Sequence, residues 1–354
     1  ETNDLTIEYI EKIKEYRKID TVLNPHDTMI NVYENYDGFV RKQYVNNDKI
    51  ILRKKDYTTY ETDHVIIDKN TFKKRFKLLT ENMFECMNWD NMVIAGGFIN
   101  ALLTPIPELY TQSTKDIKKW FNDEGYPSSD IDIFIYGLDE EQATKKLYEI
   151  YDNIKKTITC EVLCFRVPKA ATIVSKYPNR NIQIIFRLNE NIPNLLNTFD
   201  LDSCAVAYDG TTIWSSIPFH NSICNKMNII DETKTTGSYE QRLKKYSKRR
   251  YSIYPPKYEK DKVNNMIFSY KPSSLTGLAK LLVLSKLENN AKHSVFRDII
   301  DDHLIASRHV SYDKVKEDLN ISDYSNMTFA WGKDHTCLTI KKQIEQKQCK
   351  IDEI

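Results

Sequence analysis

The chain has 354 residues, of which 41% are hydrophobic and 29% charged, a balance typical of a globular protein with a sizeable core. No apolar run approaches the roughly 20 residues that span a bilayer, so we expect no membrane partner. The formal net charge is +1, so any nucleic-acid site must come from local clusters of Lys and Arg. The 7 cysteines show no zinc spacing, which favours free thiols in the cytoplasm.

The first part of the chain, residues 1–88, is predicted to be a helical and mixed region. Apolar periodicity predicts helices over residues 4–18 and 71–87, with short β-like runs at 49–53 and 64–68 between them. The second helix is expected to face the core with Phe72, Phe76, Leu79, Met83 and Phe84.

Residues 89–225 alternate between strand and helix patterns. A short apolar strand at 92–95 ends at Gly96 and Gly97 and is followed by a helix start. A polar stretch, 110–127, holds one short helix at 115–121. Next come a strand at 130–136, a helix at 139–157, β-like runs at 160–167, 170–176 and 182–187, and a short helix at 192–197. Asp209 and Gly210 between two alternating runs predict a tight hairpin.

Residues 226–354 have a helical pattern, with helices expected over 238–250, 274–290, 293–307 and 312–319. A mixed middle followed by a helical end predicts an α+β fold. We therefore expect three regions: a helical and mixed region at 1–88, a central core at 89–225, and a helical domain at 226–354.

The sequence Ser129-Asp130-Ile131-Asp132 places two carboxylates in a predicted strand. Alternation puts both aspartates on one face, while Ile131, Ile133 and Ile135 point to the other face and into a core. Two close carboxylates repel unless one is protonated or a cation lies between them, and Mg²⁺ prefers oxygen ligands. The alternative is a solvated edge strand with two surface acids.

The glycine pair upstream favours the metal hypothesis. Gly96 and Gly97 lie between a strand and a helix, where glycine lets phosphate approach the backbone and the helix end offers free N–H groups. Ser129 has a hydroxyl that either contacts a phosphate or caps a turn. Together these features predict a triphosphate cradle beside a metal site.

Over about residues 90–250 the sequence resembles the DNA polymerase β-like nucleotidyltransferase superfamily. The Gly96-Gly97 turn and the Asp130-Ile131-Asp132 strand match its pattern, and the segment from 182 to 250 resembles viral poly(A) polymerases. The resemblance implies a nucleotidyltransferase-type mixed sheet flanked by helices, Mg²⁺ or Mn²⁺ as cofactor, and a viral protein that adds nucleotides to RNA.

The sequence departs from that family at two places. The spacer between Gly97 and Asp130 is long, so residues 110–127 are predicted to be an insertion. Gln183 occupies the position of the family's third acid. Asp200 and Asp202 are the candidates to replace it, because alternation would put both on one face of the next strand. We favour Asp200 as the third metal ligand and expect either residue to contribute to catalysis.

A basic helix follows the core, with Arg242, Lys245 and either Lys248 or Arg249 at the spacing of one helix face. Such a stripe would hold a triphosphate or follow an RNA backbone, with Tyr246 or Tyr251 stacking on a base; the alternative is a solvated helix face.

Our leading hypothesis is a metal-dependent, template-independent nucleotidyltransferase of the poly(A) polymerase type, which takes part in mRNA processing. Asp130, Asp132 and Asp200 would hold the metal, and Gly96, Gly97, Ser129, Arg242 and Lys245 the nucleotide. The partners would be ATP or another NTP and an RNA 3′ end, with the viral factory or virion as alternative locations and a homodimer left open. The alternatives are a catalytically silent RNA-binding or scaffold subunit, and a nucleotidyltransferase acting on tRNA ends, protein or small molecules.

Overall fold

The computed structural model describes residues 29–42, 49–52, 63–127, 129–158, 160–167, 169–231, 234, 238–290 and 329–330. The helices expected at 4–18, 293–307 and 312–319 lie outside the described residues.

The described residues form a mixed sheet in the order β1-β8-β7-β2-β3-β6-β5-β4-β11. Only β3 and β6 run parallel in it; the other neighbours are antiparallel. Its strands are β1 (Met29–Asn31), β2 (Met92–Ala95), β3 (Ile131–Tyr136), β4 (Val162–Val167), β5 (Ala170–Ser175), β6 (Ile182–Asn189), β7 (Val206–Tyr208), β8 (Ile213–Ser216) and β11 (Phe329–Ala330). A second, parallel pair joins β9 (Met227–Ile229) and β10 (Ser252–Tyr254).

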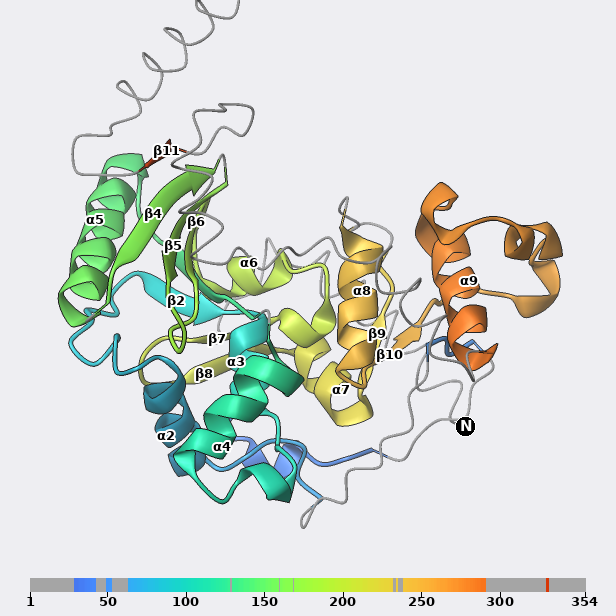
Figure 1. Cartoon of the computed structure of the whole chain (residues 1–354), viewed down its shortest axis with the longest axis horizontal. Helices are drawn as coiled ribbons and strands as arrows, with labels where there is room; N and C mark the ends of the chain where they lie inside the picture. The colour runs from blue at the N-terminus through green and yellow to red at the C-terminus, as the bar shows by residue number, and fades with distance from the viewer. Residues whose placement is uncertain are drawn as a thin grey trace, which may run out of the picture.

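Helices surround this sheet, with α8 and α9 to one side of it, as Figure 1 shows. They are α2 (Lys69–Leu79), α3 (Gly97–Leu103), α4 (Thr114–Lys119), α5 (Glu140–Thr157), α6 (Ile192–Asn197), α7 (Ile217–Asn225), α8 (Tyr239–Lys248) and α9 (Gly277–Asn290). Short 3-10 turns lie at η2 (Tyr36–Gly38), η3 (Glu108–Tyr110), η5 (Asp202–Cys204), η7 (Lys260–Lys262), η8 (Asn265–Ser269) and η9 (Pro272–Ser274), and η4 (Trp120–Gly125) is π-helical.

The two faces of β3 have different environments, as its sequence predicts. Ile131, Ile133 and Ile135 are buried in the main core, which is shared with α2, α3 and α5. A smaller apolar cluster under α6 forms on the other face, where Phe134 packs at its edge. The sheet is therefore covered by helices on both faces, and the α+β fold is confirmed.

A third apolar cluster joins α8 and α9 to β10, around Leu243, Tyr251 and Leu281. In Figure 1, α8 lies between the sheet and α9. The boundaries of the three regions stay a prediction, although β1 extends the main sheet and α2 packs into its core. No helix within the described ranges is both long and apolar enough to cross a membrane.

Two local predictions need correction, and one helix was not predicted. The helix predicted over 71–87 ends at Leu79, because Glu81 and Asn82 adopt left-handed backbone conformations that a helix excludes. Residues 199–205 form a bend and a 3-10 turn, so the strand predicted to carry Asp200 and Asp202 starts later, at β7. The helix that was not predicted is α7, which begins with a Ser216 cap and a proline in its first turn.

Candidate functional site

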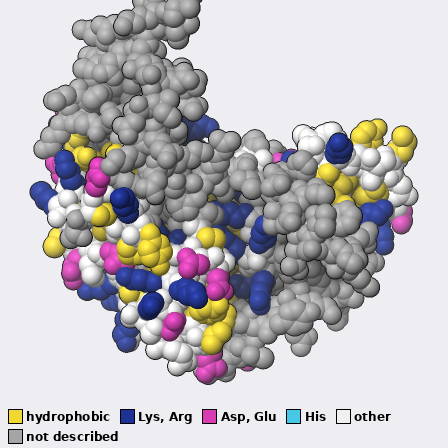
Figure 2. All heavy atoms as spheres, in the orientation of Figure 1, with side chains coloured by type: hydrophobic (Ala, Val, Ile, Leu, Met, Phe, Trp, Pro, Cys, Tyr) yellow, Lys and Arg dark blue, Asp and Glu magenta, His cyan; other side chains and the backbone are white. Residues whose placement is uncertain are grey.

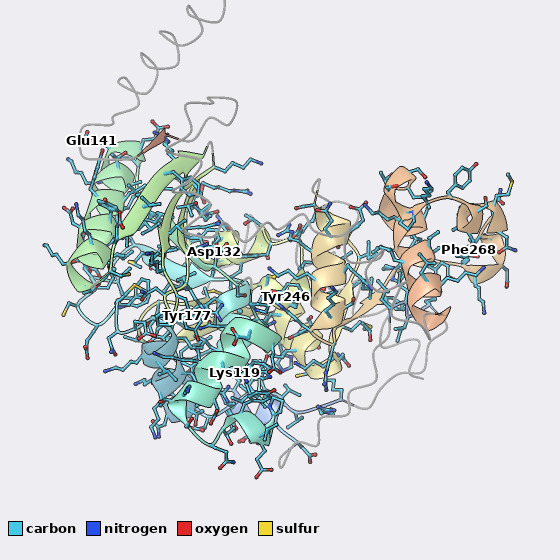
Figure 3. All side chains as sticks on the ribbon, viewed as in Figure 1. Lys119, Asp132, Glu141, Tyr177, Tyr246 and Phe268 are labelled. Atoms are coloured by element: carbon cyan, nitrogen blue, oxygen red, sulfur yellow. The ribbon has the colours of Figure 1, made fainter. Side chains whose placement is uncertain are left out.

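Asp130 and Asp132, the acidic pair, lie at the start of β3, which is flanked by β2 and β6 in the sheet. Asp132 is paired with Ala95 on β2 and with Gln183 on β6. Gly96 adopts φ +92°, a left-handed conformation suited to glycine, and a Cβ at this position would lie 3.8 Å from Asp132 Oδ2. The strand-to-helix turn and the carboxylates therefore meet, as the sequence predicts, and Figure 3 shows Asp132 at this place.

Electrostatics at Asp132 are dominated by burial. Burial, followed by the neighbouring Asp130, raises the pKa of Asp132 to about 8, although Lys245 and Arg242 oppose the shift. Gln183 Nε2 donates a hydrogen bond to Asp130 Oδ2 at 3.0 Å. A divalent ion at the pair would relieve this repulsion, since carboxylate oxygens are ligands that Mg²⁺ and Mn²⁺ accept.

The basic residues of α8 lie against this pair. Lys245 is close enough to Asp130 and Asp132 for their charges to act on it, yet burial and then Arg249 lower its pKa to about 8. Burial also lowers the pKa of Arg242. One face of α8 thus places Arg242 and Lys245 beside the acidic pair, while the ligand of the predicted helix stripe stays a prediction.

Arg249 continues this stripe beyond the end of α8. Its guanidinium lies 4.4 Å from the Tyr126 ring centroid and 4.9 Å from that of Tyr246. Arg249 Nη2 donates to Ser129 Oγ at 3.5 Å, so the buried Ser129 hydroxyl faces a cation beside the acidic pair. This choice between Lys248 and Arg249 was open in the sequence, and the structure assigns the contact to Arg249.

Tyr246 and Tyr251 have a structural role, and the prediction that either stacks on a base is wrong. They are 3% and 0% exposed, respectively. The Tyr251 hydroxyl accepts from Asn100 Nδ2 at 2.9 Å, and the Tyr246 hydroxyl accepts from Cys204 Sγ at 3.0 Å. Both rings anchor α8 to α3 and its surroundings.

The side chains of Asp200 and Asp202 have different partners. Buried Asp200 forms an ion pair with Arg242, the same residue whose charge acts on Asp132. Asp202 Oδ2 accepts a hydrogen bond from the Ile229 backbone N–H at 3.4 Å, on the side of β9. Within the described part of the chain, no three His, Cys, Asp or Glu side chains are grouped so as to hold one metal ion. The role of Asp200 as a ligand therefore stays a prediction.

Gly97 is enclosed by the side chains of Tyr246, Ser129 and Arg249. A Cβ at this position would lie 2.7 Å from the Tyr246 hydroxyl oxygen, which is too close for an ordinary contact. We expect Gly97→Ala to lower the free energy of unfolding by about 1–3 kcal/mol through overpacking, measured by urea denaturation. The double variant Gly97→Ala/Tyr246→Phe removes the clashing oxygen and should be more stable than Gly97→Ala alone. Equal stability of the two variants would contradict this packing.

Buried Arg180 fixes the 110–127 stretch to β3. Its guanidinium donates to the carbonyl oxygens of Phe121, Tyr126 and Ser129 at 2.7–3.0 Å and to Asn122 Oδ1 at 2.8 Å. Burial lowers the pKa of Arg180 to about 10. The insertion predicted between Gly97 and Asp130 is thus an ordered part of the site, which sequence reasoning left without a role.

Replacing that guanidinium should be costly. We expect Arg180→Met to lower the free energy of unfolding by on the order of 3 kcal/mol, because several buried carbonyl groups lose their donor. The exposed Arg187 offers the matched control, since Arg187→Met should change the unfolding midpoint little. Similar urea midpoints for the two variants would contradict the anchoring role.

Comparisons with known proteins add relatives of the central region. The family model described as Gabija anti-defense 2 family protein matches residues 67–228, which is less than half of the chain. The uncharacterized protein R883 of Acanthamoeba polyphaga mimivirus is 30% identical over 220 residues, which are 57% of this chain and 43% of the mimivirus protein. The chain thus matches less than half the length of that viral relative.

A solved structure, the CdnC:HORMA-deltaN complex of E. coli MS115-1, is 17% identical and covers 65% of this chain and 62% of its own. Its TM-score of 0.23 is too low to carry an argument about fold or function. Over residues 67–228 the chain is therefore similar to the Gabija anti-defense 2 family, and over 220 residues it is similar to a mimivirus protein.

Proposed function

We propose that this protein is a nucleotidyltransferase that binds a metal–nucleoside triphosphate at Asp130 and Asp132. The single observation that supports the proposal most is the pairing of two clustered carboxylates with the cations Arg242 and Lys245 beside the Gly96 turn. Such a combination fits both parts of the ligand, because the carboxylates suit a divalent ion and the cations suit the phosphates.

The chain's own residues would divide the work as follows. Asp130 and Asp132 hold Mg²⁺ or Mn²⁺, which would polarise the phosphoryl group under attack. Lys245 and Arg242 offset the negative charge that builds on the leaving pyrophosphate. The acceptor hydroxyl oxygen forms a bond to the α-phosphorus, the bond to pyrophosphate breaks, and Asp200 is proposed to accept the hydroxyl proton. Gln183 orients Asp130 through its hydrogen bond.

The finer proposal concerns donor and acceptor. The resemblance to viral poly(A) polymerases and the basic end of α8 support ATP as donor and an RNA 3′-hydroxyl as acceptor. The description of the matched family suggests that the activity serves to counter a Gabija defence. A tRNA end, a protein or a small molecule remains an alternative acceptor.

A second candidate is a catalytically silent nucleotide- or RNA-binding subunit on the same fold. Two observations favour it: Gln183 stands beside Asp132 where the family pattern has an acid, and Asp200 is engaged by Arg242. An ion pair of this kind competes with metal coordination for the same carboxylate.

A transfer assay separates these candidates. Purified protein is incubated with each α-³²P-labelled NTP and Mg²⁺ or Mn²⁺, with single-stranded RNA, tRNA or no added acceptor, and products are separated on denaturing gels. The leading proposal expects labelled RNA extended at its 3′ end, with ATP preferred. Label on tRNA or on the protein itself would support the alternative acceptors. Absence of label with every NTP, metal and acceptor would count against an enzyme and for the silent subunit.

A further inference from the structure

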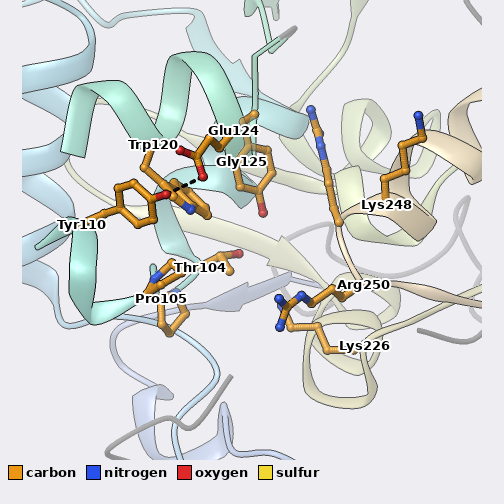
Figure 4. Close-up of a pocket in the computed structure, with 12 residues that line it drawn as sticks. Thr104, Pro105, Tyr110, Trp120, Glu124, Gly125, Lys226, Lys248 and Arg250 are labelled. Atoms are coloured by element: carbon orange, nitrogen blue, oxygen red, sulfur yellow. Dashed lines mark hydrogen bonds between the residues drawn. The ribbon is translucent and has the colours of Figure 1, made fainter. Parts of the chain in front are cut away.

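A pocket of about 300 Å³ lies beside the candidate site, between the insertion and the end of α8 (Figure 4). None of the roles assigned above to the acidic pair uses it. The described residues that line it include Tyr110, Trp120 and Glu124 on one side and Lys248, Arg249 and Arg250 on the other.

One wall of the pocket is aromatic and is built by the insertion. The Trp120 ring lies over Gly125, where a Cβ would come within 2.5 Å of the ring, so only glycine permits this arrangement. The π-helical turn of η4 carries Trp120, and such turns are frequent at functional sites. The Tyr110 hydroxyl donates a hydrogen bond to Glu124 Oε2 at 2.5 Å, so the carboxylate on this wall has a partner.

The opposite wall is basic, as Figure 4 shows with Lys226, Lys248 and Arg250. Lys226 and Arg250 both adopt left-handed backbone conformations, with φ of 47° and 70°. Such conformations are uncommon outside glycine and are often retained at functional positions. The Ser252 backbone N–H donates to the Lys226 carbonyl oxygen at 2.8 Å, which brings the starts of β9 and β10 side by side.

Figure 2 shows Lys and Arg side chains in the middle of this face of the molecule. They lie between the region of α2 and α4 and the region of α9. A wall of aromatic rings that faces a wall of cations suits a ligand with a flat ring and a phosphate group. The volume is at the lower end of the roughly 300–1,000 Å³ typical of small-molecule sites, which suits one nucleotide.

We infer that this aromatic and basic pocket is a second site, which binds a phosphorylated nucleoside with its base against Trp120 and its phosphate against Lys248 and Arg250. The nucleoside is either a free nucleotide or one residue of a single strand. Arg249 links the pocket to the acidic pair, because it lines the pocket and also donates to Ser129. The inference goes beyond the proposed function and does not depend on transfer at Asp130 and Asp132.

The test measures binding in the presence of EDTA, so that the acidic pair has no divalent ion. AMP, adenosine and inorganic phosphate are titrated by calorimetry, and a fluorescent oligo(A) RNA by anisotropy. Trp120→Ala removes the stacking surface, and Trp120→Phe restores a ring. Lys248→Ala/Arg250→Gly removes two cations, and glycine adopts the left-handed conformation at position 250 without strain. The exposed pair on α2 supplies the matched control, Lys73→Ala/Lys74→Ala.

We expect AMP to bind more tightly than adenosine or phosphate. Trp120→Ala and Lys248→Ala/Arg250→Gly should each weaken AMP binding by about tenfold or more, while Trp120→Phe and the α2 control bind like wild type. The measurement uses neither a divalent ion nor an acceptor, so a failed transfer assay leaves this inference standing. If oligo(A) binds more tightly than AMP, the ligand is a residue of a single strand. If the two bind equally, the ligand is a free nucleotide. Absence of AMP and RNA binding, or unchanged binding in the pocket variants, would overturn it.

Discussion

Asp130→Asn/Asp132→Asn is expected to lower nucleotidyl transfer by about 10³-fold or more, which corresponds to at least roughly 4 kcal/mol of transition-state stabilisation. The reason is that the pair supplies the charged oxygen ligands of the proposed ion, and Asn replaces each charge with a neutral amide of similar shape. The measurement is the initial rate of labelled RNA formation with saturating ATP and Mn²⁺.

The matched control for that experiment is on α5, where Glu140 and Glu141 are exposed acids at the first turn. Glu140→Gln/Glu141→Gln removes the same number of charges beyond the opposite end of β3 from the acidic pair and should transfer at the wild-type rate. If the β3 double variant retains wild-type activity while the protein is an active transferase, the reaction takes place elsewhere and the assigned site is wrong.

Asp132→Asn is expected to stabilise the metal-free protein, and by more as the pH rises. The folded state holds the Asp132 proton up to a pKa of about 8, whereas an unfolded aspartate releases it near pH 4. The folded state therefore binds more protons between these values, so the free energy of unfolding of the wild type decreases as the pH rises from about 4 to about 8. Asn carries no such proton and avoids the cost of a buried charge.

The difference between Asp132→Asn and wild type should be small near pH 4 and reach on the order of 3 kcal/mol near pH 8. Urea denaturation across this range, without divalent ions, provides the measurement. The Glu140→Gln/Glu141→Gln variant should follow the wild type at every pH. A variant that is less stable than wild type near pH 8 would show that Asp132 is a favourable partner of Lys245 rather than a strained carboxylate.

The sequence predicted those parts of the fold that depend on local patterns. Alternation on β3 separated Ile131 and Ile133 from the aspartates, and the helix predicted over 139–157 forms as α5, whose first turn is capped by Asp139 and Gln142. Asp209-Gly210 formed the expected hairpin, with Gly210 at φ +96°. These features are fixed by residues a few positions apart.

The rest of the site depends on contacts between distant segments. The sequence around Asp200 and Asp202 fits a strand as well as the observed bend. Their environments differ through contacts with distant segments, because Asp200 pairs with Arg242 on α8 and Asp202 accepts from Ile229 on β9. The role of the insertion in the site could not be predicted from its own sequence. Its residues contact Arg180 and share a pocket with the turn after α8, and both of these lie far away along the chain. The positive φ of Arg250 leaves no mark in the sequence.

Isothermal titration calorimetry with a non-hydrolysable ATP analogue tests most directly whether the carboxylates and the α8 cations together bind a metal–nucleotide. The titration is run on wild type and on Asp130→Asn/Asp132→Asn, each with Mg²⁺ and with EDTA. Binding by wild type that is strengthened by Mg²⁺, and loss of this strengthening in the variant, is the predicted result. If Mg²⁺ changes the binding of both proteins equally or of neither, the carboxylates bind no metal–nucleotide, and the central claim is contradicted.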